Sequence, residues 1–160
     1  MSNRKFYALL GVVLILGIVG SLVFSSNSGL KKEIEMEQAG IELNTQFVDK
    51  FFNYASTKQR YDNVKSLMTE RGYRSTYPSG MELPADSSVK SQVSNLKIYV
   101  QKAPSVKENQ MEILNQFVAT TEFNEIQSSK EVIMKTFLVY EESVGWMIND
   151  IEMIIQNAEE

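Results

Sequence analysis

An uninterrupted apolar run near the N-terminus constrains this chain more than any other feature. The 19 residues from Phe6 to Phe24 carry no charge, and Ser21 is their one clearly polar side chain. A helix of this length spans about 28 Å, close to the roughly 30 Å hydrocarbon thickness of a bilayer. Arg4 and Lys5 precede the run, and basic flanks stay in the cytoplasm. The sequence therefore predicts a cytoplasmic tail over residues 1–5, a transmembrane helix over 6–24 and an extracytoplasmic remainder.

A cleaved signal peptide is the alternative for this run. Val23-Phe24-Ser25 loosely fits a small-residue cleavage site. The apolar part of a signal peptide has about 7 to 15 residues, however, and this run is longer. The chain has no cysteine to lipidate, which excludes a lipoprotein. We expect a retained anchor and a single-pass protein of the cell membrane.

The composition of residues 25–160 narrows the function classes. They contain all 20 acidic and 14 of the 16 basic residues, a net charge of −6. Nucleic-acid binding needs a basic face, so we expect none. The chain also lacks histidine and cysteine, which removes the usual ligands of zinc and the usual base of a nucleophilic triad. We expect no cofactor, no metal and no catalytic residues.

Hydrophobic periodicity changes once along the exported part. A short polar linker and a charged stalk cover residues 25–38, and one domain is expected over 39–160. Apolar residues at helical spacing predict a long helix from Leu30 to Lys58 and a shorter one from Arg60 to Arg71, with Gly72 after its end. Tyr73 to Ser88 is expected to be irregular.

Four antiparallel strands are predicted after this segment. Residues alternate between apolar and polar around 96–101, 111–123, 132–140 and 144–155. The connections are too short for parallel crossovers. The apolar phase switches near Asn149-Asp150, which predicts a β-bulge. The fold class is α+β: a transmembrane helix, then a long and a short helix packed on a curved four-stranded antiparallel sheet.

This layout resembles the cone-shaped fold of the nuclear-transport-factor-like superfamily. The resembling residues are Phe47-Val48-Asp49-Lys50-Phe51-Phe52-Asn53-Tyr54 on the helix and Val144-Gly145-Trp146-Met147-Ile148-Asn149-Asp150-Ile151 in the last strand. The resemblance covers about 110 residues and implies that the long helix lies in the concave face of the sheet. Enzymes, binding modules and scaffolds share this fold, so the fold alone does not give the function.

The combination with one N-terminal span is similar to the bitopic assembly-scaffold subunits of type IV secretion systems, especially in Gram-positive conjugative elements. This resemblance implies a non-catalytic scaffold that forms homo-oligomers and contacts other subunits of the secretion channel. A membrane-tethered domain that binds a small ligand in the cone is the alternative. An enzyme is a third reading, and it would need a carboxylate such as Asp150 to face a pocket.

Two groups of residues are candidates for functional roles. The first is an interaction surface beside the second helix, since exposed aromatic and arginine side chains are common at interfaces: Arg71, Tyr73, Arg74 and Tyr77. The second would line the cavity or core of the cone: Phe47, Phe51, Phe117, Phe137, Trp146 and Asp150. An open polar pocket among them would favour ligand binding, and a filled interior would favour a scaffold.

Overall fold

The computed structural model describes residues 29–78, 89–101 and 109–158. The chain divides into two compact units, Met1–Gln38 and Ala39–Glu160. The predicted span 6–24 lies outside the described residues. Among the residues that are described, no helix is long and apolar enough to cross a membrane.

Helical residues run from 29 to 52, and we call the part in the larger unit, residues 39–52, the core helix. The predicted helix continued to Lys58, which is wrong. The chain leaves the helix at Asn53, and Tyr54 forms an antiparallel bridge with Ser91. The Tyr54 N–H donates to the Ser91 carbonyl oxygen at 3.1 Å, and the Ser91 N–H donates back at 2.9 Å. Backbone groups of Tyr54 that pair with the sheet cannot also continue the helix, so the helix ends before this residue.

Two short helices follow. Helix α2 covers Thr57–Val64, a 3₁₀ turn covers Lys65–Leu67, and α3 covers Glu70–Thr76. Ser56 caps α2, because its side chain accepts a hydrogen bond from the Gln59 N–H at 3.2 Å. The prediction of one helix from Arg60 to Arg71 is therefore wrong, because α2 ends at Val64 and α3 begins at Glu70. The apolar residues of the predicted helix are nevertheless buried: Tyr61, Val64, Leu67 and Met68.

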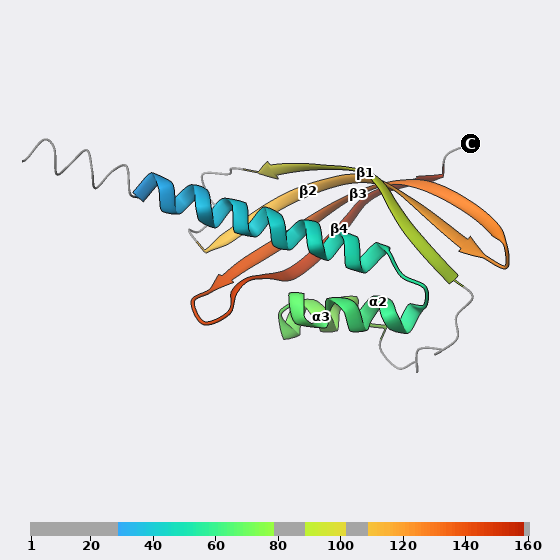
Figure 1. Cartoon of the computed structure of the whole chain (residues 1–160), viewed down its shortest axis with the longest axis horizontal. Helices are drawn as coiled ribbons and strands as arrows, with labels where there is room; N and C mark the ends of the chain where they lie inside the picture. Colours follow the sequence, from blue (N-terminus) through green and yellow to red (C-terminus); the bar gives the residue numbers. More distant parts are fainter. Residues whose placement is uncertain (1–28, 79–88, 102–108, 159–160) are drawn as a thin grey trace, which may run out of the picture. The chain divides into compact units, whose positions relative to one another are not determined.

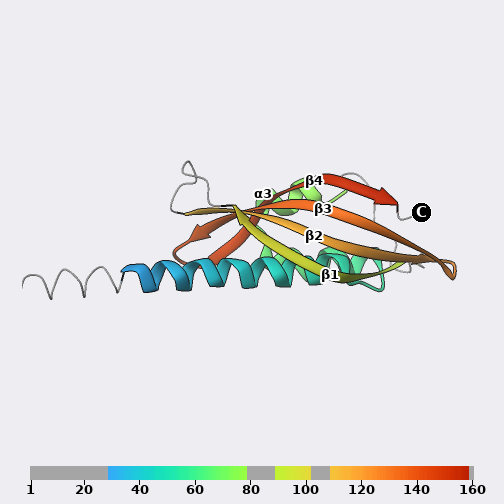
Figure 2. The same cartoon turned by 90° about the horizontal axis from the view of Figure 1, so that it is seen from above.

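The four predicted strands form one antiparallel sheet in the order β1-β2-β3-β4 (Figure 1). They are β1 Val89–Gln101, β2 Gln110–Phe123, β3 Ile126–Glu141 and β4 Gly145–Ala158. The α+β class and the antiparallel sheet are therefore confirmed. The strands fan out with a strong twist, and Figure 2 shows β1 and β4 at opposite edges.

The β2–β3 connection is shorter than the gap between the strands predicted around 111–123 and 132–140. Only Asn124 and Glu125 lie between the strands, with φ angles of 49° and 67°. Two consecutive positive φ angles are typical of a type I′ turn, whose twist matches that of a hairpin. The strands continue to Phe123 and Ile126, which are paired.

The core lies between the core helix and one face of the sheet. Phe47, Phe51, Phe117 and Trp146 are buried there, and Phe47 has no exposed surface. Rings of the helix also contact rings of the sheet: the centroids of Phe52 and Phe117 are 4.7 Å apart. Burying side chains of this size contributes about 1.5–3 kcal/mol each relative to exposure.

Phe137 and Asp150 do not line the interior, which corrects the expectation for both. On β3 the buried residues are Val132, Met134, Thr136 and Leu138. Successive side chains of a strand point to opposite faces, so Phe137 lies on the face away from the core helix. Asp150 pairs with Phe137 and shares that face.

Candidate functional site

A pocket on the outer face of the sheet, beside α3, is lined by charged, amide, aromatic and aliphatic side chains. The pocket forms where α3 packs against β4. The Thr69 N–H donates to the Ile148 carbonyl oxygen at 2.9 Å, and Met68 forms a parallel bridge with Ile148. The Thr69 hydroxyl donates to Asn149 Oδ1 at 2.9 Å and accepts from the Gly72 N–H at 3.0 Å. One residue thus caps α3 and fastens it to the strand.

Gly72 allows α3 to approach β4 closely. A Cβ atom at this position would lie 2.6 Å from the Ile148 carbonyl oxygen and 2.9 Å from that of Asn149. Gly72 therefore belongs inside α3 as a contact residue, and its predicted place after the end of a helix is wrong. The sequence does not reveal that α3 begins at Glu70, because Thr69-Glu70 follows directly on residues with helical spacing.

The predicted β-bulge is confirmed and shapes the pocket. Phe137 pairs with Asp150, whereas the next residue, Leu138, pairs with Ile148. Asn149 is therefore an extra residue in β4, and its side chain is available to the Thr69 hydroxyl. Asp150 Oδ1 accepts a hydrogen bond from the Ile151 N–H at 2.9 Å. A bulge redirects the side chains of an edge strand in this way.

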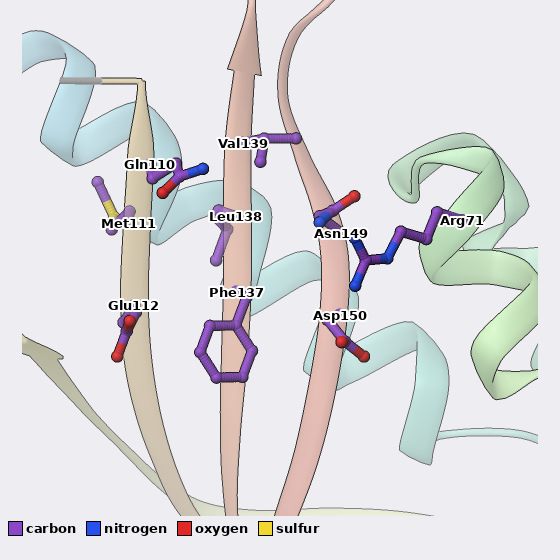
Figure 3. A pocket seen from close by; sticks show the side chains of 9 residues that line it. All are labelled: Arg71, Gln110, Met111, Glu112, Phe137, Leu138, Val139, Asn149 and Asp150. Atoms are coloured by element: carbon purple, nitrogen blue, oxygen red, sulfur yellow. The ribbon is translucent and has the colours of Figure 1, made fainter. Parts of the chain in front are cut away.

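The pocket has a volume of about 250 Å³. Figure 3 shows Glu112, Phe137 and Asp150 side by side on β2, β3 and β4, while the Arg71 guanidinium extends from α3 to β4. The three strand residues occupy one row of the sheet. The full lining consists of Arg71, Gln110, Met111, Glu112, Phe137, Leu138, Val139, Asn149 and Asp150.

The charges of this pocket are partly compensated from within the chain. Lys135 Nζ lies 3.8 Å from Glu112 Oε2 and 5.6 Å from the centroid of the Phe137 ring. The Arg71 guanidinium makes no hydrogen bond or ion pair with any other described residue. Among the described residues, no group of three or more His, Cys, Asp or Glu side chains is placed to hold a metal ion. The pocket can hold a polar group against an aromatic ring.

The interior of the cone contains a closed ring of polar side chains that sequence reasoning missed. Asn44 of the core helix donates from Nδ2 to Asn115 Oδ1 at 2.7 Å. Asn115 Nδ2 donates to Thr136 Oγ1 at 3.1 Å, and Thr136 Oγ1 donates to Asn44 Oδ1 at 2.6 Å. All three residues are fully buried. The ring joins the helix to the centres of β2 and β3 and occupies space where a ligand could otherwise bind.

The predicted interaction surface is divided by the structure. Tyr73 and Tyr77 lie together, with ring centroids 5.4 Å apart, and Tyr61 contacts Tyr77 at 5.1 Å. Burial, helped by neighbouring Tyr77, raises the pKa of the Tyr73 hydroxyl. Arg74 pairs with Glu70 on the surface of α3. Arg71 extends to the pocket on β4 instead (Figure 3), so it does not join the tyrosines.

Arg60 is a second feature that the sequence did not reveal. Its guanidinium carbon lies 3.8 Å from the centroid of the Phe51 ring and within 6 Å of three further rings, Phe52, Tyr54 and Tyr61. Desolvation by burial lowers the pKa of this guanidinium. Nε is buried without a hydrogen-bond partner in the described residues. Arg60 acts as a cationic bridge between the end of the core helix and α2.

Comparisons with known proteins agree with the fold. The profile of a family described as YddI NTF2-like domain matches residues 36–155. The uncharacterised protein YddI of Bacillus subtilis (strain 168) is 26% identical over 110 residues, which are 69% of this chain. The match spans 63% of that relative's length. No solved structure matches the chain.

Proposed function

We propose that this chain, which belongs to the YddI NTF2-like domain family, is a non-catalytic scaffold subunit, anchored in the cell membrane by residues 6–24, that helps to build a conjugative type IV secretion channel. Its domain acts outside the cytoplasmic membrane by self-association and by contacts with other channel subunits. The anchor rests on the apolar run and its basic flank, and the secretion role rests on the resemblance stated above.

The filled interior is the observation that carries the scaffold reading. Ligand binding in a cone-shaped fold needs space between the helix and the sheet. Here that space holds Phe47, Phe51 and Phe117 together with the ring of Asn44, Asn115 and Thr136. A ring of satisfied polar groups is rigid and costly to open. The domain therefore offers its outer surface for contacts more readily than its interior.

Deletion of the gene from its conjugative element tests this function. We expect DNA transfer to fall to the background of the assay and to return when the full chain is supplied from a second locus. The control is deletion of a gene of the element that lies outside the transfer region. Transfer at the wild-type frequency without this chain would refute the proposal.

A further inference from the structure

The two edges of the sheet are only partly covered. In the described residues, the edge of β1 is bridged once, by Tyr54 at Ser91, and the edge of β4 once, by Met68 at Ile148. Asn53 Oδ1 also accepts from the Val93 N–H at 2.6 Å. Beyond these positions, residues 96–101 of β1 and 150–153 of β4 pair on one side only with strands of the part of the chain that the structure describes. Unpaired edges offer backbone hydrogen bonds to another chain.

These two open segments lie at the same level of the sheet. Tyr99 pairs with Leu114, Leu114 with Lys135, and Lys135 with Glu152. Tyr99 and Glu152 thus end one row, and by the same pairings Gln101 and Asp150 end another. All three neighbouring pairs are antiparallel. If a second copy lies beside the first in the plane of the sheet, its β1 runs antiparallel to β4 of the first copy. The rows of paired residues then continue from one copy into the next.

The side chains of the two edges are complementary. Within the open segments, β1 carries Lys97 and no acidic residue, whereas β4 carries Asp150 and Glu152 and no basic residue. Large apolar side chains are also exposed on both edges: Tyr99 is 50% exposed on β1, and Met153 and Ile154 are 44% and 46% exposed on β4. Opposite charges and apolar contacts across neighbouring strands each contribute roughly 0.2–1 kcal/mol.

We propose that a second copy of this chain docks its β1, residues 98–101, antiparallel against β4, residues 150–153, and so extends the sheet from one copy to the next. Tyr99 of one copy then stands opposite Glu152 of its partner, and Lys97 reaches the same carboxylate diagonally. Bulges bound the paired segment on both strands, at residues 95–96 of β1 and at Ile154 of β4. Because two different edges meet, the contact is heterologous and yields a ring or a filament.

This inference specifies the self-association in the proposed function and rests on it for the expectation that copies meet at one membrane. Its test measures contact between copies and not DNA transfer, so the two can fail separately. The natural chain has no cysteine, so only the introduced cysteines can form a disulfide. Opposed residues of antiparallel strands have Cα atoms about 4.5–5.5 Å apart, within the range that a disulfide spans.

The experiment mixes full-length Tyr99→Cys chains with full-length Glu152→Cys chains under mild oxidation. The expected product is a covalent dimer that forms from the mixture and from neither variant alone. Gln92→Cys replaces Tyr99→Cys in the control, because Gln92 is exposed on β1 in a row that β4 does not share. This mixture is expected to form no disulfide-linked dimer. No dimer from the first mixture, or equal dimer from Tyr99→Cys alone, would overturn the proposal.

A charge exchange gives an independent readout. Lys97→Glu and Glu152→Lys should each lower the concentration-dependent association of the full chain in sedimentation experiments by several-fold. The double variant should recover most of the loss, since the pair is restored with opposite sense. Association that is unchanged by both single substitutions, with the folded signal of Trp146 intact, would also overturn the proposed interface.

Discussion

Replacing Asn44 by alanine tests whether the buried polar ring fixes the core helix on the sheet. The substitution removes the donor to Asn115 Oδ1 at 2.7 Å and the acceptor of the Thr136 hydroxyl at 2.6 Å. Thr136 keeps a weaker acceptor, the Ile113 carbonyl oxygen at 3.3 Å. The Asn115 oxygen then has no donor among the described side chains. A buried group left unsatisfied costs about 1–3 kcal/mol, and the lost side-chain atoms leave a cavity.

We expect Asn44→Ala to lower the free energy of unfolding by about 3 kcal/mol. With a urea dependence of about 1.5 kcal/mol per M, the unfolding midpoint falls by about 2 M. The assay is equilibrium unfolding in urea, followed by the fluorescence of Trp146, the one tryptophan of the chain, which is buried in the core. The folded baseline should keep its emission maximum, because the apolar packing around Trp146 is unchanged.

Thr45→Ala is the matched control on the neighbouring helical position. The Thr45 hydroxyl donates only to the Ile41 carbonyl oxygen of its own helix, at 2.8 Å, so its loss should change the free energy of unfolding by less than about 0.5 kcal/mol. Equal effects of the two substitutions would refute the reasoning about the ring. Replacing all three ring residues by apolar side chains of similar size should recover part of the loss.

Three further predictions concern other contacts, at Gly72, Arg60 and Glu125. Gly72→Ala should destabilise the domain by about 2 kcal/mol in thermal unfolding, because the added Cβ meets backbone oxygens of β4. The control is Gly29→Ala, whose Cβ meets nothing within 4 Å and which should be neutral or slightly stabilising. Equal effects of the two substitutions would contradict the close approach of α3 to β4. Arg60→Ala should lower the free energy of unfolding in urea by about 2 kcal/mol. Arg60→Met should lower it less, because methionine keeps an apolar stem over the Phe51 ring. A larger loss for Arg60→Met than for Arg60→Ala would argue against stacking. Glu125→Gly should raise the free energy of unfolding by about 0.5–1 kcal/mol, because glycine tolerates the φ of 67°, and a lower melting temperature would oppose the turn assignment.

The periodicity of the sequence was sufficient for the fold class, the strands and the bulge at Asn149. It could not decide the inward face of β3, because apolar residues occupy both faces there: Ile133, Phe137 and Val139 alternate with Val132, Met134 and Leu138. The core helix and the polar ring choose between them, since Thr136 must face Asn44. Only the tertiary contact carries that information.

The candidate site also contains residues that the sequence could predict and residues that it could not. The sequence predicts a bulge near Asp150, and the structure places this residue in a pocket beside the docked α3. Arg71 joins that pocket because Gly72 lets α3 lie close to β4, which no local pattern indicates. Asn44 and Arg60 have polar side chains that sequence patterns assign to the surface. Their burial depends on partners 71 residues away for Asn44 and on a cluster of four rings for Arg60.

The central claim is that a scaffold domain works here because it is fixed at a membrane. The most direct measurement is DNA-transfer frequency in a strain that lacks the gene and receives either the full chain or residues 25–160 exported through a cleavable signal. The full chain is predicted to restore transfer, and the untethered domain, at equal abundance outside the membrane, is predicted to leave it at background. Full restoration by the untethered domain would contradict the account.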